Sequence, residues 1–309
     1  MLRKDCLMTP IPELNPAQVY IDALPSPTSR KSMKGALKIV AKTLGGGDDP
    51  YTFDWTSVRY SHSMYARAQF AKKYAPQTTN RLLVALRRVL ETTWRMGLMS
   101  SEDYHRASDV KDVASSDALF GRMIDPDEFE RMCAMCRNGT KAGKRDLAIL
   151  HILRYAGLRR DELVGVNVAD FDSEDKSLRV HKGKGAQRRV VYLPNKAIAA
   201  VSDWLLVLGG KPSHPMFVGV KKNDEPARER ISGMGIYNII NKCAALAGTG
   251  EVHPHDFRRT YISDLFDKGV DISTISKLAG HNKSDHTVGY DRRKEDPKRR
   301  AAELYDDEE

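Results

Sequence analysis

No apolar run of eighteen or more residues occurs in this sequence, so no segment of it is predicted to span a membrane. Its first residues lead into Pro10 and Pro12 rather than into an apolar stretch, so no secretory signal is recognisable. These two absences favour a soluble, cytoplasmic protein.

Cysteine is scarce as well, with four residues in a chain of 309. They are too few and too scattered for a disulfide framework. Cys133 and Cys136 form a CxxC motif, but no second pair and no Cys/His partner stands at the spacing of zinc ligands. We therefore expect these two cysteines to pack inside a helix, and we expect neither a metal site nor a cofactor.

What the sequence has in excess is positive charge: 50 Lys and Arg against 41 Asp and Glu, which gives a net charge of +9. Cationic surfaces attract phosphate through the release of counterions, so nucleic acid is a natural partner. Basic residues outnumber acidic ones both before and after residue 120. If double-stranded DNA is the ligand, we expect both halves of the chain to contact it.

The apolar pattern predicts helices alone from residue 14 to about 106, then a polar linker over 107–121. Four helices are expected, over 16–23, 28–44, 54–75 and about 78–96. The last has an apolar stripe on one face and, on the other, the arginines Arg81, Arg87 and Arg88. These arginines are either a solvated helix face or a surface that follows a DNA backbone.

Residues 122–309 mix helices with a few strands, which predicts an α+β domain with a small antiparallel sheet. Strands over 177–181 and 188–193 flank Gly183-Lys184-Gly185 and predict a hairpin. Helices are expected over 146–155, 196–208, 234–247, 255–268 and 272–279. The protein is therefore predicted to be mainly α, with a helical N-terminal domain and an α+β second domain.

Several polar residues stand at the ends of these elements. Arg159 follows Gly157 at a helix end, Lys184 occupies the hairpin turn, and each taken alone is compatible with an ordinary surface cation. His255 and Arg258 are three residues apart, so they share one face at the start of a helix, where backbone amides favour a phosphate. A metal site at His253 and His255 is disfavoured because neither carboxylate nor Cys partners stand nearby.

Two further residues follow the helix that Gly280 is expected to end. His281 lies just beyond that glycine, and Ser284 can cap another helix carrying Tyr290. Each of the two, considered alone, is compatible with an unremarkable surface position.

The order Arg, Lys, His, Arg, His, Tyr and the local context of each residue resemble those of the tyrosine recombinase (phage integrase) family. The spacings of 23 residues from Arg258 to His281 and 9 from His281 to Tyr290 are typical of that family. The helical N-terminal pattern is similar to the family's core-binding, SAM-like domain. The resemblance implies six catalytic positions and one supporting acid: Arg159, Lys184, His255, Arg258, His281 and Tyr290, with Glu162 in support.

In this resemblance Tyr290 is the nucleophile that forms a 3′-phosphotyrosine link to DNA, and His255 is its general base. Arg159 and Arg258 bind the phosphate, Lys184 protonates the departing 5′ oxygen, and no metal or ATP is required. One departure is that Asp291-Arg292-Arg293, rather than Thr-His, follows the tyrosine.

The resemblance extends to assembly and setting. It implies a simple Xer-like or transposon-borne recombinase without an arm-binding domain, working in the bacterial cytoplasm on nucleoid or plasmid DNA. Four protomers would act on two DNA sites through a Holliday junction, with accessory DNA-bending proteins where needed. A type IB topoisomerase, which relaxes DNA as a monomer, and a non-catalytic DNA-binding accessory protein are the alternatives. An intact catalytic set disfavours the second.

Overall fold

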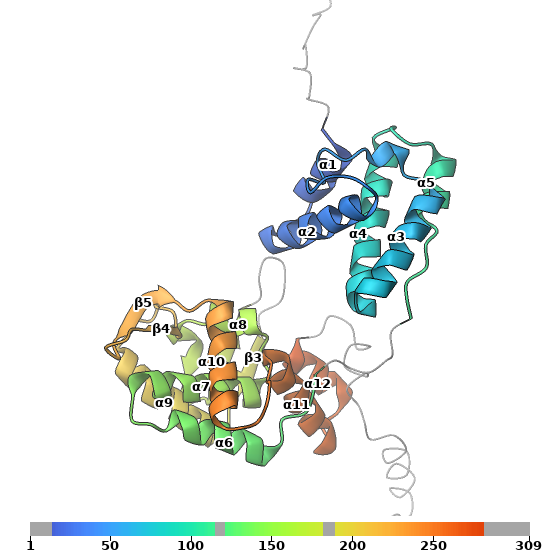
Figure 1. Cartoon of the computed structure of the whole chain (residues 1–309). Coiled ribbons are helices and arrows are strands. Elements are labelled where there is room, and N and C mark those ends of the chain that lie inside the picture. The colour runs from blue at the N-terminus through green and yellow to red at the C-terminus, as the bar shows by residue number, and fades with distance from the viewer. Residues whose placement is uncertain (1–13, 115–120, 182–188, 281–309) are drawn as a thin grey trace, which may run out of the picture. The chain divides into compact units, whose positions relative to one another are not determined.

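The computed structural model describes residues 14–114, 121–181 and 189–280, and the chain divides into two compact units, residues 1–118 and 119–309 (Figure 1). Each unit has its own hydrophobic core. In the described part of the chain, no helix is both long and apolar enough to cross a membrane.

The described part of the N-terminal unit is entirely helical. Its helices begin after polar caps: the side chains of Asn15, Ser26 and Ser100 each accept a hydrogen bond from a backbone amide in the following turn. The elements are α1 (Pro16–Asp22), α2 (Pro27–Thr43), the 3-10 turn η1 (Trp55–Ser57), α3 (Tyr60–Lys73), α4 (Pro76–Arg95) and α5 (Ser101–Ser108).

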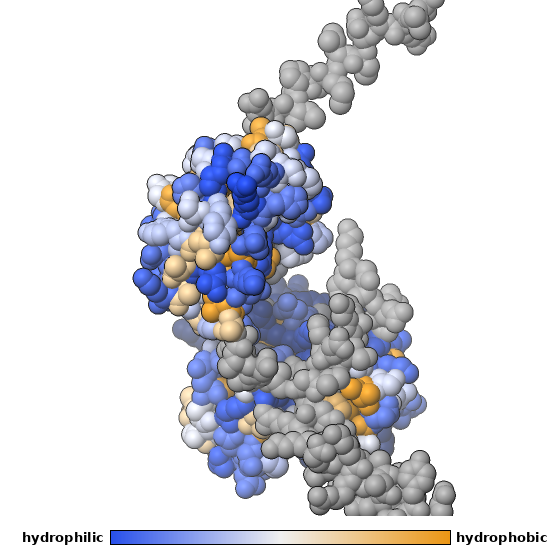
Figure 2. Space-filling model, turned by 90° about the vertical axis from the view of Figure 1, so that its right-hand side faces the viewer, coloured by the Kyte–Doolittle hydropathy of each residue, from blue (hydrophilic) through white to orange (hydrophobic). Residues whose placement is uncertain are grey.

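Helix α4 is the centre of this unit, because α1, α2, α3 and α5 all pack against it. Its predicted apolar stripe is buried, with Leu82, Leu86 and Leu90 at most 1% exposed. The face of the unit shown in Figure 2 is mainly hydrophilic, with small apolar areas between the polar residues. The apolar stripe predicted from the sequence is therefore the face of α4 that packs into the core.

The structure corrects the predicted number of helices in this unit from four to five. Helix α5 was not predicted, and Asp54 caps the short turn η1 rather than a long helix. A tertiary contact stabilises α5: the ring of Tyr104 stacks on that of Trp94, with centroids 4.9 Å apart. Such a contact leaves no local signal in an eight-residue polar segment.

The segment that follows α5 remains bound to the N-terminal unit. The side-chain amide of Asn80 exchanges two hydrogen bonds with the backbone of Val113, at 2.8 and 2.9 Å. Arg87 donates to the carbonyl of Val110 at 2.8 Å and to the carboxylate of Asp112 at 2.8 Å. Part of the segment predicted as a linker is therefore fixed along α4.

The C-terminal unit combines helices with two small antiparallel sheets, as the fold class predicted. Its elements are α6 (Pro126–Cys136), α7 (Lys141–Ala156), α8 (Arg160–Gly165), the turn η2 (Val168–Asp170), β1 (Phe171–Asp172), β2 (Ser177–Val180), β3 (Arg189–Tyr192), α9 (Asn195–Leu208), β4 (Val218–Val220), β5 (Pro226–Arg230), α10 (Gly233–Leu246), α11 (Pro254–Asp267) and α12 (Ile272–Ala279).

Helix α7 is the central element of the second core, with α6, α9 and α11 packed around it. The sheet order is β1-β2-β3, and Val180 pairs with Arg189 across the predicted hairpin. The prediction that Cys133 and Cys136 pack within a helix is confirmed, since both are buried on α6. The sulfur of Cys136 lies 3.4 Å from that of Cys243 on α10.

Candidate active site

Arg159 stands directly after the turn that ends α7. Gly157 caps this helix with a φ of 57°, a left-handed conformation that glycine adopts without strain. A Cβ atom at Gly157 would also collide with the ring of Tyr261. The chain can therefore reverse closely against α11 and present Arg159, whose side chain is 42% exposed, at the start of α8.

Glu162 on α8 anchors this arginine. Its carboxylate accepts from the backbone amide of Arg159 at 2.9 Å and from the Arg159 guanidinium at 3.0 Å. A second guanidinium, that of Arg189 on β3, donates to both carboxylate oxygens at 3.0 and 2.8 Å. Burial alone would raise the pKa of Glu162, but the hydrogen bonds and charge of Arg189, with a smaller effect of Arg159, lower it to about 2.

The guanidinium group of Arg258 is held by two backbone carbonyls, one on each Nη atom. One Nη donates to the carbonyl of Gly157 at 2.8 Å and the other to the carbonyl of Ala279 at 2.6 Å. The side chain is only 2% exposed, although it belongs to a charged residue type that is rarely buried. Arg159 reaches the next carbonyl of the same helix end, that of Gly280, at 3.3 and 3.4 Å. The two predicted arginines therefore meet at the C-terminal end of α12.

His255 lies one turn before Arg258 on α11, and Phe257 between them points into the core, as predicted. Desolvation and the nearby guanidinium of Arg258 lower the pKa of His255, and Arg159 adds a smaller effect in the same direction. The imidazole is therefore neutral at neutral pH, the state in which it can accept a proton.

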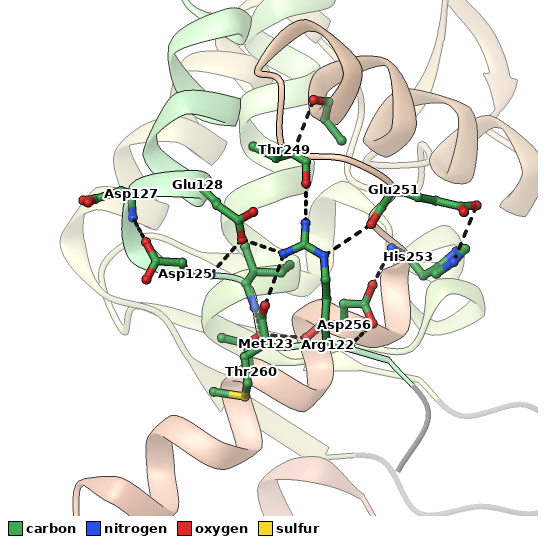
Figure 3. Close-up of polar contacts among 12 residues, drawn as sticks. Arg122, Met123, Asp125, Asp127, Glu128, Thr249, Glu251, His253, Asp256 and Thr260 are labelled. Atoms are coloured by element: carbon green, nitrogen blue, oxygen red, sulfur yellow. Dashed lines mark hydrogen bonds and ion pairs between the residues drawn. The ribbon is translucent and has the colours of Figure 1, made fainter. Parts of the chain in front are cut away.

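A polar network holds the N-terminal end of α11 (Figure 3). The Asp256 carboxylate accepts from the backbone amides of His253 at 2.8 Å and Arg122 at 3.1 Å. The Arg122 guanidinium donates in turn to Glu128 at 2.6 Å and to the carbonyl of Thr249 at 2.8 Å. His255 is thereby placed on a helix start that is fixed to α6 and to the loop before α11.

The remaining predicted catalytic residues, Lys184, His281 and Tyr290, lie outside the described residues. The described elements nearest to them in sequence are the paired ends of β2 and β3 around Lys184, and the end of α12 before His281. Within residues 14–114, 121–181 and 189–280, no group of three or more His, Cys, Asp or Glu side chains could hold a metal ion.

The arginines predicted to contact DNA lie on α4 and differ in their surroundings. Arg81 is exposed, and Arg88, with a side chain 60% exposed, pairs with Glu91 at 2.7 Å. Arg87 is more buried, at 30%, because it binds the segment after α5. Arg81 and Arg88 are thus the more accessible of the three.

Reasoning from the sequence missed Arg189, Arg122 and Asp256. The position of Arg189 carried a usable signal: it is two residues before Val191, so the two side chains lie on the same face of the strand, and Val191 is fully buried. A lone arginine on the inner face of a strand indicates a buried ion pair. Arg122 and Asp256 bind partners more than a hundred residues away in the chain, and no local pattern reports such contacts.

Comparisons with known proteins add to this geometry. The sequence model of the phage integrase family matches residues 122–296. A tyrosine recombinase of Synechocystis sp. is 27% identical over 277 residues, which are 86% of each chain. Tyrosine recombinase XerC of Chromohalobacter salexigens is 28% identical over 276 residues, again 86% of each.

Solved structures share the fold. The integrase of transposon Tn1549, in complex with transposon right end DNA, superposes with a TM-score of 0.69 at 17% identity, over 94% of this chain and 99% of that one. A lambda integrase dimer bound to a core site gives 0.70 at 12% identity, over 90% of this chain and 93% of that one. At these identities the likeness is one of fold.

Proposed function

Because the chain belongs to the phage integrase family and is a tyrosine recombinase that cleaves and rejoins DNA, we propose that Arg159, His255 and Arg258 bind and activate one scissile phosphate. In this proposal Lys184, His281 and Tyr290 complete the site. The attacking group is the Tyr290 hydroxyl, and the product is a 3′-phosphotyrosine diester with a free 5′ hydroxyl.

The observation that carries the proposal is the meeting of Arg159 and Arg258 at adjacent carbonyls of α12. Each guanidinium can donate forked hydrogen bonds to the non-bridging phosphate oxygens, whose charge grows as the phosphorus becomes five-coordinate. Arg159 and Arg189 place two guanidinium groups on the single carboxylate of Glu162, and Arg258 adds a third cation at the same end of α12. The excess positive charge favours an anionic substrate.

The direction of proton transfer follows from the charge states of the tyrosine and of His255. A tyrosine has an ordinary pKa near 10, so its hydroxyl must lose a proton in order to attack at neutral pH. The lowered pKa of His255 keeps its ring neutral and able to accept that proton. As the bond from phosphorus to the 5′ oxygen breaks, Lys184 gives a proton to that oxygen, and His281 donates a hydrogen bond to the phosphate. The reverse steps rejoin the strands.

The diester bond to Tyr290 conserves the free energy of the broken phosphodiester, so rejoining requires no nucleotide hydrolysis. We further propose that Arg81 and Arg88 of the N-terminal unit contact the DNA backbone. Four protomers on two sites would exchange strands through a Holliday junction, with accessory DNA-bending proteins at some sites. The named relatives are recombinases, which favours recombination over relaxation of supercoils.

The test is covalent trapping on a nicked suicide substrate, from which the short 5′ product diffuses away so that the covalent link persists. The sequence of the target is found first, by trapping the protein on genomic DNA and sequencing the attached ends. Tyr290→Phe should bind this DNA as the parent does and form no adduct. Tyr192→Phe, at a tyrosine 63% exposed on β3, is the matched control and should form it. An adduct with Tyr290→Phe would refute the assignment.

A further inference from the structure

Arg189 on β3 connects three elements of the active site without lying on its surface. Its side chain is 10% exposed. Its two Nη atoms donate to the two oxygens of Glu162 on α8, and its Nε donates to the carbonyl of Leu278 on α12 at 2.8 Å. Its Nε and both Nη atoms thus donate to groups of the protein itself, and the side chain is nearly buried.

Three arginines bind the C-terminal end of α12. Three consecutive carbonyls, those of Leu278, Ala279 and Gly280, accept hydrogen bonds from Arg189, Arg258 and Arg159 respectively. The last carbonyls of a helix have no partner within the helix and carry its partial negative charge, so they attract cations. Glu162 adds a second link between Arg189 and Arg159.

We propose that Arg189 is a positioning residue for strand cleavage, which sets Arg159 through the shared carboxylate of Glu162. This inference rests on the proposed function of Arg159. Two guanidinium groups share one carboxylate, and Arg189 takes the greater part of it, so Arg159 keeps donors available for the phosphate. Without Arg189, the buried charge of Glu162 would have Arg159 as its remaining guanidinium partner and would draw it away from the substrate.

Arg189 also supports Arg159 in a second way, through the end of α12. Its bond to Leu278 fixes the end of α12 two residues before Gly280, whose carbonyl Arg159 also uses. A Cβ atom at Gly280 would meet the Arg189 guanidinium, which shows how closely the helix end approaches that side chain. Loss of Arg189 therefore removes both supports of Arg159 at once.

The experiment is a double-mutant cycle between Arg189 and Arg159, measured as the rate of covalent adduct formation at saturating DNA. Arg189→Gln should slow cleavage roughly 10–100-fold, the range found for residues that orient the ligands of a metal, which act at one remove in the same way. Arg189→Lys should recover part of the rate, because one ammonium keeps the charge but cannot fork. In an Arg159→Lys background, Arg189→Gln should slow cleavage by less than about 3-fold, because coupled residues are not additive.

The matched control is Arg145→Gln, which removes a buried arginine paired with Asp146 at 2.7 Å on α7, away from α8 and α12. It should lower thermal stability while leaving the rate per folded molecule unchanged. Equal losses from Arg189→Gln in both backgrounds would overturn the proposal. So would a loss that disappears when rates are normalised to folded, DNA-bound protein, as measured by circular dichroism and filter binding.

Failure of this inference can be told apart from failure of the proposed function. If Arg159→Lys alone cleaves like the parent, the proposed phosphate contact is wrong. If Arg159→Lys is slow while Arg189→Gln is as fast as the parent, only the role of Arg189 is refuted. Should Arg189→Gln not fold, the same cycle is run with Arg189→Lys, whose partial loss must likewise vanish in the Arg159→Lys background.

Discussion

The interiors of the two units differ in charge. In the described N-terminal unit, the buried polar side chains are Ser63, Thr79 and Thr93, and none is charged. The described part of the C-terminal unit buries eight ionisable acids and arginines: Arg145, Asp146, Arg154, Glu162, Asp170, Asp256, Arg258 and Arg259. Burying a charge is unfavourable unless it is paired and hydrogen-bonded.

The two cores serve different purposes. An apolar core such as that around α4 stabilises a unit whose outer face we propose to bind DNA. The buried charges of the second unit lie partly around the proposed phosphate site, and two of the eight, Glu162 and Arg258, are direct members of it. Burying these charges lowers the stability of the second unit, but it holds the cations in fixed positions.

The largest expected effect comes from changing a buried cation of the second unit while keeping its charge. Arg258→Lys should slow covalent cleavage roughly 10²–10³-fold, because the single ammonium cannot reproduce the fork. Adduct formation on the suicide substrate measures the rate, with DNA binding measured in parallel. A rate within a few-fold of the parent would show that Arg258 is buried for structural reasons alone.

The apolar core should respond in stability rather than in chemistry. Leu86→Ala on α4, at a side chain 1% exposed, should lower the free energy of unfolding by about 3 kcal/mol. Chemical denaturation measures this, and Val84→Ala, at a residue 39% exposed on the same helix, is the control. If Leu86→Ala instead slows cleavage by fully folded, DNA-bound protein, the contrast between the two units is broken.

A third prediction concerns His151, a histidine buried in the second unit. Burial, with smaller effects of Lys196 and Arg137, lowers its pKa to about 4. Since the unfolded chain takes up the proton first, stability is full above about pH 6.5 and is lost as the pH falls towards 4. Between pH 7 and pH 5 the loss should be on the order of 2 kcal/mol.

His151→Phe should abolish this part of the acid sensitivity, as measured by urea unfolding at the two pH values. The change keeps the aromatic contact with Phe129, whose ring centroid lies 5.6 Å from that of His151. His105→Phe, at an exposed histidine of α5, should leave the difference between pH 7 and pH 5 as it is in the parent. An unchanged difference in His151→Phe would contradict the prediction.

The smallest effect is expected on the outer face of the N-terminal unit. Arg81→Ala should weaken DNA binding by about 1 kcal/mol and reduce the slope of log affinity against log salt by about 1. Arg106→Ala, at a side chain 72% exposed on α5, is the control. Equal effects of both changes would mean that binding follows net charge rather than a defined face of α4.

Most of the fold followed from the sequence, because its long helices have clear apolar periods and polar caps. Helix α12 was predicted with its bounds, and α9, α10 and α11 to within one residue at each end. The short elements α5, α8 and β4–β5 were missed. Six to eight residues carry too little apolar periodicity to be recognised, even though Ser100 caps α5 and Glu162 caps α8. The strand Pro226–Arg230 has no apolar alternation.

In the candidate site, too, some residues were predicted from the sequence and others were not. Arg159, His255 and Arg258 stood out because each lies at a helix end that local rules predict, and the family resemblance gave their order a meaning. Glu162 was identified through the resemblance, but its second partner, Arg189, was not. The strand pattern indicates that Arg189 faces inward, but which distant carboxylate it pairs with depends on how the chain is folded.

The three arginines at α12 are bound by main-chain oxygens, which every residue type provides. Replacing the side chain of Leu278 or Ala279 leaves these acceptors in place, so the anchorage is insulated from most point substitutions there. What it depends on is the path of the backbone, and the φ of 62° at Gly280 is part of that path. These three hydrogen bonds therefore constrain the shape of the helix end, while the packing of Leu278 and the buried Ala279 constrains its side chains.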